Sequence, residues 1–408
     1  MQQYCEKGYH LDKKRTALFW IWLMMFVAYL DRINITVAGP TIMKALHINH
    51  AQFGYVLSAF TFGYALMQVP GGYLADRFGP RRLLVAALIV WSAFTAATGL
   101  AWSFLSIVVI RILFGVGEGI ENGAQFKLIG DYFDSRARSS ANALFLTALA
   151  LGPAIGSPAT AKLIELTGWR GLFFSFALLG LIVAALMYFF LPETGTDVVH
   201  TDVSESAGDV PSWQGILRRP QTWLVFGTYM FFNVAFWGFL GWMPTYLSDS
   251  RHIVLKELGM KASLPYLCGF VGMIVLGQLG TRVLFRHRPI LIAAGYAAAA
   301  GFLYVAFKAA DIPHCLLGLS LAGFFLYGGF GPFWAIALDL IPDNIRGVLT
   351  GFVNVGGQIG GFVAPIVVGH IVETSKSYTG GFLFMIGALV LAAICLCALQ
   401  ALTRTRTS

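Results

Sequence analysis

The stretch GYLADRFGPRR, from Gly72 to Arg82, decides the fold of this chain. It returns 205 residues later, in a weaker form, as GQLGTRVLFR, from Gly277 to Arg286. The glycine, the first arginine and the later arginine recur in both copies, and each copy lies at the end of a long apolar segment. An internal repeat near half of the chain length is typical of membrane proteins built from two homologous halves, with a central site between them.

The composition places the chain in a membrane. Of its 408 residues, 57% are hydrophobic and only 12% are charged, whereas soluble domains carry about 25% charged residues. A soluble protein of this size needs a polar surface that this sequence cannot supply. The lipid bilayer is therefore the expected surrounding. The net charge of +8 fits basic cytoplasmic loops better than a nucleic-acid partner.

The apolar segments predict an all-α integral membrane protein. A spanning helix needs about 20 apolar residues, and twelve segments of suitable length can be delimited. They fall at 16–46, 51–75, 82–101, 104–128, 137–163, 170–191, 220–247, 257–281, 289–308, 313–340, 345–372 and 380–402. We expect two pseudo-symmetric six-helix bundles, at 1–191 and 220–408, joined by a polar cytoplasmic linker at 192–219.

Basic residues set the expected orientation. Arginines and lysines gather before the first segment, after the even-numbered segments and after the last one. All of these positions lie on one side if both termini are cytoplasmic. We expect a multi-pass protein of the inner membrane.

Five charged residues lie inside the apolar segments of the first half: Asp31, Arg32, Arg111, Glu118 and Glu121. A charge at the bilayer centre costs at least about 2.5–3.5 kcal/mol on insertion scales, so each one needs a reason. The second half has essentially none at corresponding depths. We infer that charge coupling lies in the first half, while the second half contributes aromatic and amide contacts.

Depth along the helices suggests how three of these charges are used. Asp31 and Arg111 come at similar depths and could pair, either as a fixed ion pair or as a pair whose state changes with protonation during transport. Glu118 follows Arg111 by seven residues, which returns it to nearly the same face close to the midplane. A carboxyl group buried there can take and release protons near neutrality. Asp31, Glu118 and Arg111 are therefore the predicted proton-coupling residues.

The motifs that carry a family resemblance span nearly the whole chain. The Gly72–Arg82 stretch resembles the loop signature of the major facilitator superfamily. Within it, YLDRIN at Tyr29–Asn34 and RILFGVGEG at Arg111–Gly119 resemble the anion:cation symporter family. GWMPTYL, GPFW and GFVNVGGQ, in segments seven, ten and eleven, complete the match. The resemblance implies uptake of small organic anions, such as sugar acids, tartrate-like acids or aromatic carboxylates, usually with protons as the coupling ion and no cofactor.

The resemblance also implies a substrate site. Arg32 is the leading anion anchor, since its guanidinium stays protonated and matches a carboxylate. The remaining implied contacts are Tyr29, Tyr64, Trp334 and Asn354, to which we add Gln358, one turn beyond Asn354. For Glu121 three roles stay open: a second proton site, a hydroxyl acceptor or a structural acid.

A cytoplasmic gate is expected at Gly72, Asp76, Arg77 and Arg81. Glycine permits close helix approach, and Asp76 with the basic residues can form charge pairs that open when the halves rock.

Other classes of protein are less well supported by the residues. No nucleophile–base set or metal motif is visible, so we do not expect an enzyme. The alternative is an exporter or antiporter of amphipathic compounds in the same superfamily, against which the intramembrane acid and arginine set argues. We expect a monomer, because no GxxxG motif here indicates dimerisation by itself.

Overall fold

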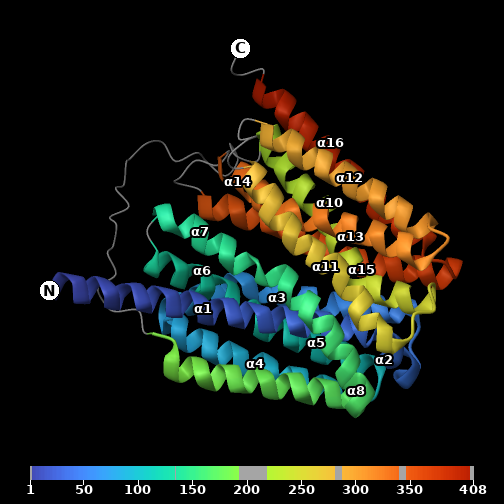
Figure 1. Ribbon diagram of the computed structural model, residues 1–408, viewed down its shortest axis with the longest axis horizontal. Helices are drawn as coiled ribbons and strands as arrows, with labels where there is room; N and C mark the ends of the chain where they lie inside the picture. Colours follow the sequence, from blue (N-terminus) through green and yellow to red (C-terminus); the bar gives the residue numbers. More distant parts are fainter. Residues whose placement is uncertain (1, 134, 193–217, 281–286, 340–345, 405–408) are drawn as a thin grey trace. The chain divides into compact units, whose positions relative to one another are not determined.

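The computed structural model describes residues 2–133, 135–192, 218–280, 287–339 and 346–404, and it is helical almost throughout these ranges (Figure 1). The expected linker at 192–219 lies, for residues 193–217, outside the described part of the chain. The helices of the first half are α1 (Gln2–Val37), α2 (Gly39–Leu46), α3 (His50–Phe78), α4 (Pro80–Gly99), α5 (Phe104–Gly119), α6 (Glu121–Tyr132), α7 (Ser135–Leu146) and α8 (Ala148–Phe190). Those of the second half are α10 (Pro220–Asp249), α11 (Leu255–Gln278), α12 (Arg288–Lys308), α13 (Ile312–Gly328), α14 (Phe330–Asp339), α15 (Arg346–Ser375) and α16 (Thr379–Arg404).

These helices confirm the predicted all-helical membrane fold. Nine helices of the described part are long and apolar enough to cross a membrane. One of them, α8, holds two predicted segments, because its backbone breaks at Gly168, where φ is 71°. The other two segments are α3, whose polar and glycine residues lower its mean hydropathy, and the pair α5 and α6. The helix is interrupted at Ile120, so α5 with 16 residues and α6 with 12 are each shorter than a span. Twelve spans result.

The chain divides into two compact units. Unit 1 comprises residues 1–42 and 59–203, and unit 2 comprises residues 43–58 and 204–408. The division crosses α3, whose first residues belong to unit 2. There the Ser58 hydroxyl donates a hydrogen bond to the Phe362 carbonyl at 2.7 Å. A Cβ on Gly54 would lie 2.5 Å from the Pro365 carbonyl oxygen, so the backbones of α3 and α15 meet closely at this point.

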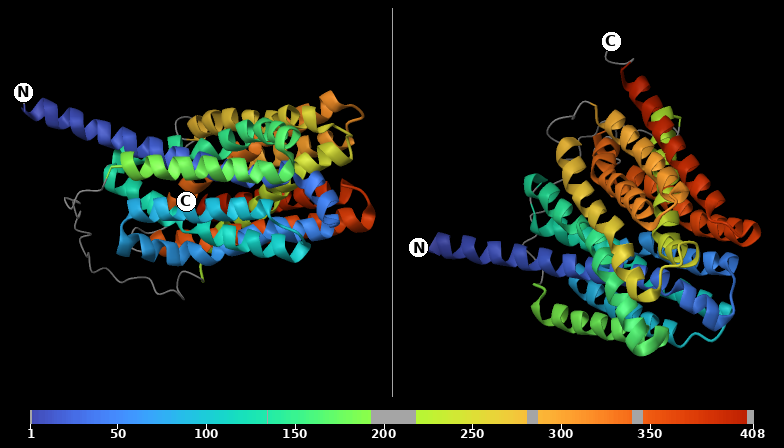
Figure 2. Two further views of the ribbon diagram at one scale, coloured as in Figure 1. Left: turned by 90° about the horizontal axis from the view of Figure 1, so that it is seen from below. Right: turned by 45° about the vertical axis from the view of Figure 1, so that its right-hand side comes forward.

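Unit 1 is held together by helix pairs that approach closely. The chain runs along α1, returns along α3, and α8 lies beside both α1 and α4 (Figures 1 and 2). Gly152 of α8 lies against Tyr29 of α1, where an added Cβ would come within 2.5 Å of the Tyr29 Cβ. This contact fixes the part of α1 that carries Tyr29, Asp31 and Arg32.

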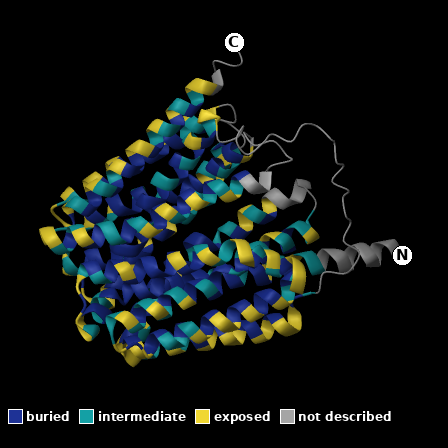
Figure 3. Cartoon of the chain, turned by 180° about the vertical axis from the view of Figure 1, so that it is seen from behind, coloured by how far each residue is buried: buried dark blue, intermediate teal, exposed yellow. Residues whose placement is uncertain are grey.

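Unit 2 has an aromatic core. The Phe232 ring stacks on Tyr296 with centroids 5.1 Å apart, and Phe236 meets Tyr327 edge-on at 5.0 Å. Phe330 of α14 contacts both phenylalanines. In each unit the buried residues lie along the inner faces of the helices, and the exposed apolar residues lie on outer faces, as expected for helices in lipid (Figure 3).

Candidate functional site: a buried ion cluster in unit 1

Two glycines bring the backbones of α3 and α5 into contact near the buried ion cluster that is described below. A Cβ on Gly63 would lie 2.0 Å from the Ile112 carbonyl oxygen, and a Cβ on Gly115 would lie 2.2 Å from that of Phe60. The two glycines come from opposite helices, so the contact is reciprocal. Because backbone atoms cannot yield as a flexible side chain can, both positions require glycine. The contact places Phe60 and Tyr64 of α3 beside the end of α5.

Arg32 forms a buried ion pair with Glu118. Both the Nε and the Nη2 atom of Arg32 lie 2.6 Å from Oε1 of Glu118. The Arg32 side chain is 4% exposed and that of Glu118 is fully buried. At such a site the attraction between two charges is much stronger than in water, and so is the cost of removing either partner.

Aromatic faces surround the guanidinium. Its Cζ atom lies 4.4 Å from the ring centroid of Tyr29, 5.0 Å from that of Tyr64 and 5.2 Å from that of Phe60. These distances are typical of cation–π contacts. Asn122 donates a hydrogen bond to the Tyr64 hydroxyl and so holds that ring in place. Asn122 was not among the predicted site residues; its position next to Glu121, within the predicted segment 104–128, was the signal.

Glu121 and Gln125 extend the cluster along α6. Gln125 Nε2 donates to Glu121 Oε2 at 3.1 Å, while Glu121 Oε1 lies 3.8 Å from Arg32 Nη2. Neither residue has measurable exposure. Gln125 was also missed by the sequence analysis, although it follows Glu121 by one helical turn.

The predicted partnership of Asp31 with Arg111 is not the ion pair of this structure. No salt bridge between them occurs in the described part of the chain. Asp31 instead accepts a hydrogen bond from Asn34 at 3.2 Å, and the Arg111 guanidinium lies over Phe114 at 4.3 Å. The two residues remain within electrostatic range of each other.

The physical reason lies in side-chain direction. Helical side chains tilt toward the N-terminus of their own helix, and α5 runs opposite to α1 (Figure 1). The long Arg32 side chain therefore reaches toward the C-terminal end of α5, where Glu118 lies. Comparison of Cα depths alone had left Arg32 without a protein partner at its own level.

The predicted substrate contacts fall in both units. Tyr29, Arg32 and Tyr64 lie together in unit 1, as described. In unit 2 the Trp334 ring meets Tyr229 edge-on at 5.1 Å. Asn354 and Gln358 share one face of α15, both half-buried. A substrate role for these residues stays a prediction.

The predicted gate residues lie at the α3–α4 connection and on the neighbouring helices. Asp76 pairs with Lys127 of α6 at 2.6 Å, and Arg81 donates to the Tyr188 carbonyl of α8. Gly72 lies against Gly123 of α6, where a Cβ on Gly123 would come within 2.7 Å of the Gly72 Cα. Arg77 is exposed.

A second charged group lies in unit 2, at the start of α3. His50 Nε2 lies 3.0 Å from Asp249 Oδ2, and His50 Nδ1 lies 3.3 Å from Glu373 Oε2. The Tyr378 hydroxyl donates to the same Asp249 oxygen at 3.0 Å. His50 precedes the predicted span at 51–75, so this group belongs to the end of the helices. None of its residues was among the predicted site residues.

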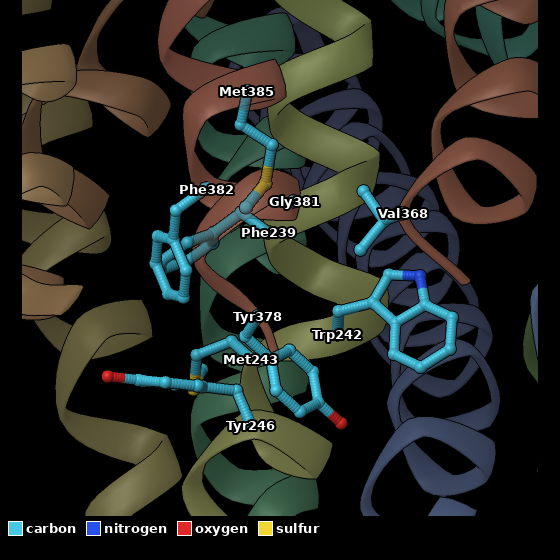
Figure 4. Close-up of a pocket in the computed structure, with 9 residues that line it drawn as sticks. All are labelled: Phe239, Trp242, Met243, Tyr246, Val368, Tyr378, Gly381, Phe382 and Met385. Carbon is cyan, nitrogen blue, oxygen red and sulfur yellow. The ribbon is translucent and has the colours of Figure 1, made fainter. Parts of the chain in front are cut away.

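A small pocket lies beside the His50 group. It has room for about one water molecule, and its walls are apolar and aromatic (Figure 4). The lining residues are Phe239, Trp242, Met243, Tyr246, Val368, Tyr378, Gly381, Phe382 and Met385. The pocket is too small and too apolar to bind an organic anion.

The fold and the intramembrane ion cluster define a multi-pass membrane transporter, and sequence comparison gives its family. Residues 21–365 match the model of the Major Facilitator Superfamily. The chain belongs to the major facilitator superfamily, which confirms the predicted family and the expectation of a transporter rather than an enzyme.

Individual relatives are named transporters of organic acids. The chain is 32% identical to a probable sulfoacetate transporter of Cupriavidus necator, with 90% of each chain covered. It is 29% identical to a hexuronate transporter of Bacillus subtilis, with 94% of this chain and 93% of the relative covered. A probable L-galactonate transporter of Escherichia coli is also 29% identical, over 89% of this chain and 84% of the relative.

Solved structures share the fold. A bacterial homologue of the human lysosomal transporter Spinster, in its inward-facing and unoccupied conformation, superposes with a TM-score of 0.81 at 18% identity. The match covers 96% of this chain and 97% of that chain.

Proposed function

We propose that this protein imports a small organic anion together with protons by alternating access. The proposal places it in the inner membrane as a monomer with both termini cytoplasmic, with protons as the coupling ion and no cofactor. The names of its relatives support an organic acid as substrate, and the candidates include a sulfonated acid and several sugar acids. The observation that carries the proposal is the buried Arg32–Glu118 ion pair, with Nη2 and Oε1 2.6 Å apart.

This ion pair offers a direct way to couple a proton to an anion. Arginine never gives up its proton in a protein, so only Glu118 can change the charge of the pair. Protonation of Glu118 removes the negative charge that holds the guanidinium. Arg32 is then free to bind the carboxylate of a substrate. Loss of the proton restores the ion pair and displaces the anion, so that proton and anion enter and leave together.

The surroundings of the pair support this role. The aromatic faces of Tyr29, Phe60 and Tyr64 favour a cation at this position. They keep the guanidinium in place while its acidic partner changes. Asp31 and Arg111 form a second charged site within electrostatic range of Glu118, and we assign them to the same coupling system.

The gate belongs to the same proposal. The Asp76–Lys127 pair is exposed, with side-chain exposures of 73% and 34%, so breaking it costs at most about 1 kcal/mol. A contact of that strength can open and close in each transport cycle. Trp334, Asn354 and Gln358 of unit 2 stay predicted substrate contacts, as the family resemblance implies.

Uptake by the purified protein in lipid vesicles tests the proposal. We expect wild-type protein to accumulate one of the acids in the names of its relatives, such as sulfoacetate, a hexuronate or L-galactonate, when the outside is acidic. A protonophore should abolish accumulation. Glu118→Gln imitates the protonated acid permanently, so exchange of internal for external substrate should continue while accumulation is lost.

A matched variant controls for the loss of a carboxylate. Glu165 lies on α8 and pairs with Lys162 at 3.5 Å, away from the ion cluster. Glu165→Gln should accumulate substrate as the wild type does. Full accumulation by Glu118→Gln would remove Glu118 from the coupling role, and uptake that ignores the pH gradient would refute symport.

A further inference from the structure

A second buried carboxylate, Glu121, lies one turn beyond Glu118, and the proposed proton coupling does not use it. Glu121 begins α6, and its only salt-bridge partner in the described part of the chain is Arg32 Nη2, at 3.8 Å from Oε1. That distance is too long for a hydrogen bond. The second oxygen, Oε2, receives one hydrogen bond, from Gln125. Glu121 is therefore weakly paired for a carboxylate that is fully buried.

The cluster has more hydrogen-bond acceptors than donors. Among the acids and Gln125 of the described cluster, four buried oxygens receive no hydrogen bond: Asp31 Oδ2, Glu118 Oε2, Glu121 Oε1 and Gln125 Oε1. On the donor side, Arg111 Nε makes none either. Buried polar atoms are nearly always paired in native proteins. Gln125 matters most here, because it is a neutral side chain whose Nε2 donates to Glu121 while its Oε1 receives no hydrogen bond. The excess of acceptors indicates a bound group that brings donors.

The charges of the cluster give the same indication. Asp31, Glu118 and Glu121 are three acids against the two arginines Arg32 and Arg111. An anionic substrate that takes Arg32 also takes the guanidinium from Glu121, while the coupling proton neutralises only Glu118. Glu121 would then be a buried carboxylate without a counter-charge, which is strongly unfavourable. A cationic group on the substrate restores the balance.

We infer that Glu121 and Gln125 form a second subsite, which binds an ammonium group of the substrate. The substrates of this chain would then be carboxylates that carry an amino group close by, within about one helical turn, or about 5 Å, of the carboxylate. The inference rests on the proposed function, because it takes Arg32 as the anchor for the carboxylate. Tyr29 and Tyr64, whose ring faces attract the Arg32 cation, lie beside the proposed carboxylate anchor.

A hydroxyl group could also donate to Glu121, but it would not supply the missing charge. Succinate, malate and aspartate separate the two chemistries, because they share four carbons and two carboxylates and differ at one position. That position carries hydrogen, hydroxyl and ammonium, respectively. Binding of each compound to the purified full chain is measured by titration calorimetry, with melting temperature as a check on folding.

We expect wild-type protein to bind aspartate about tenfold or more tighter than succinate. Glu121→Gln should remove that preference by weakening aspartate and leaving succinate within about twofold. Glu121→Asp, which keeps the charge on a shorter side chain, should retain part of the preference. Glu165→Gln, the exposed control, should bind all three as the wild type does.

Several results would overturn the inference. Malate binding as tightly as aspartate, with the same loss in Glu121→Gln, would make Glu121 a hydroxyl acceptor. An unchanged order of affinities in Glu121→Gln would remove the subsite altogether. The inference would also be wrong if none of the three compounds bound to protein that does bind another acid without an amino group. Failure of the proposed function would give different results. Either Arg32→Lys would bind the acid as tightly as the wild type does, or uptake would not depend on the pH gradient.

Discussion

Two clusters in this molecule are built to one plan, a cation between two carboxylates. In unit 1 Arg32 lies between Glu118 and Glu121, and in unit 2 His50 lies between Asp249 and Glu373. Their burial differs. The side chains of the first cluster are 4%, 0% and 0% exposed, whereas His50, Asp249 and Glu373 are 29%, 31% and 24% exposed.

The difference shows which group can respond to protons. Arg32 keeps its charge at every physiological pH, so any change in the unit 1 cluster must occur on its acids, and burial makes that change costly. In unit 2 the cation is His50, whose imidazole can gain and lose a proton. The hydrogen bond with Asp249 raises the pKa of His50 above its ordinary value. Solvent screens the charges of this cluster, so a change in the charge of His50 has only a small effect on the stability of the fold. We therefore expect the buried arrangement to serve the proposed coupling and the more exposed arrangement to serve local stability.

Removal of the buried cation should have the largest effect. Arg32→Met leaves Glu118 and Glu121 without their shared counter-charge, and we expect a loss of about 3–5 kcal/mol in the free energy of unfolding. The double variant Arg32→Met/Glu118→Gln should recover part of that loss, because one of the two ionised partners is gone while Glu121 remains, yet it should not transport. Thermal melting in detergent and vesicle uptake measure the two properties separately. If Arg32→Met were as stable as the wild type, the ion pair would make no contribution to the free energy of unfolding.

The architecture followed from the sequence because it depends on long-range patterns. The apolar segments and the 205-residue repeat at Gly72 and Gly277 predict twelve spans and two halves. The assignment of residues 43–58 to unit 2 could not be predicted in this way. It depends on contacts such as Gly54 against Pro365, and a repeat does not reveal which helices a segment will pack against.

The candidate site was predicted in composition but not in pairing. The five buried charges of unit 1 were identified, because a charge inside an apolar segment stands out. Their partners depend on side-chain reach and direction, which joined Arg32 to Glu118 in place of the expected Asp31–Arg111 pair. Asn122 and Gln125 were missed, since an amide among glycines gives a weaker signal than a charge.

The glycine contact beneath the buried cluster gives a test of intermediate size. Gly115→Ala places a methyl group 2.2 Å from the Phe60 carbonyl oxygen, so α3 and α5 must separate. We expect a loss of about 1–3 kcal/mol in stability and weaker substrate binding, since Phe60 and Tyr64 move away from Arg32. Gly301 of α12 is the control, because nothing lies within 4 Å of an added Cβ there. Gly301→Ala should be neutral or slightly stabilising, and equal losses at both positions would contradict the close-contact argument.

The exposed cluster should show the smallest effect, and its pH dependence has a definite sign. Since the folded-state pKa of His50 is raised above the unfolded value of about 6.5, its stabilising charge is fully present below pH 6.5. That contribution is lost as pH rises through the folded-state pKa. The groups facing His50 are Asp249, Glu373 and Tyr378, the last two on α15 and its connection to α16.

His50→Gln should therefore flatten the decline of melting temperature with pH above about 6.5, and the difference from wild type should stay within about 1 kcal/mol, as for other exposed ion pairs. High salt should reduce it further, because the cluster is open to solvent. His252 is a suitable control: it is exposed and its φ of 54° suits asparagine, so His252→Asn should keep the wild-type pH profile. An effect of His50→Gln as large as that of Arg32→Met would break the comparison, because exposure would then not govern the strength of these clusters. A profile with the same slope in wild type and His50→Gln would show that the imidazole carries no linked proton, and only the buried cluster would remain as a proton-responsive element.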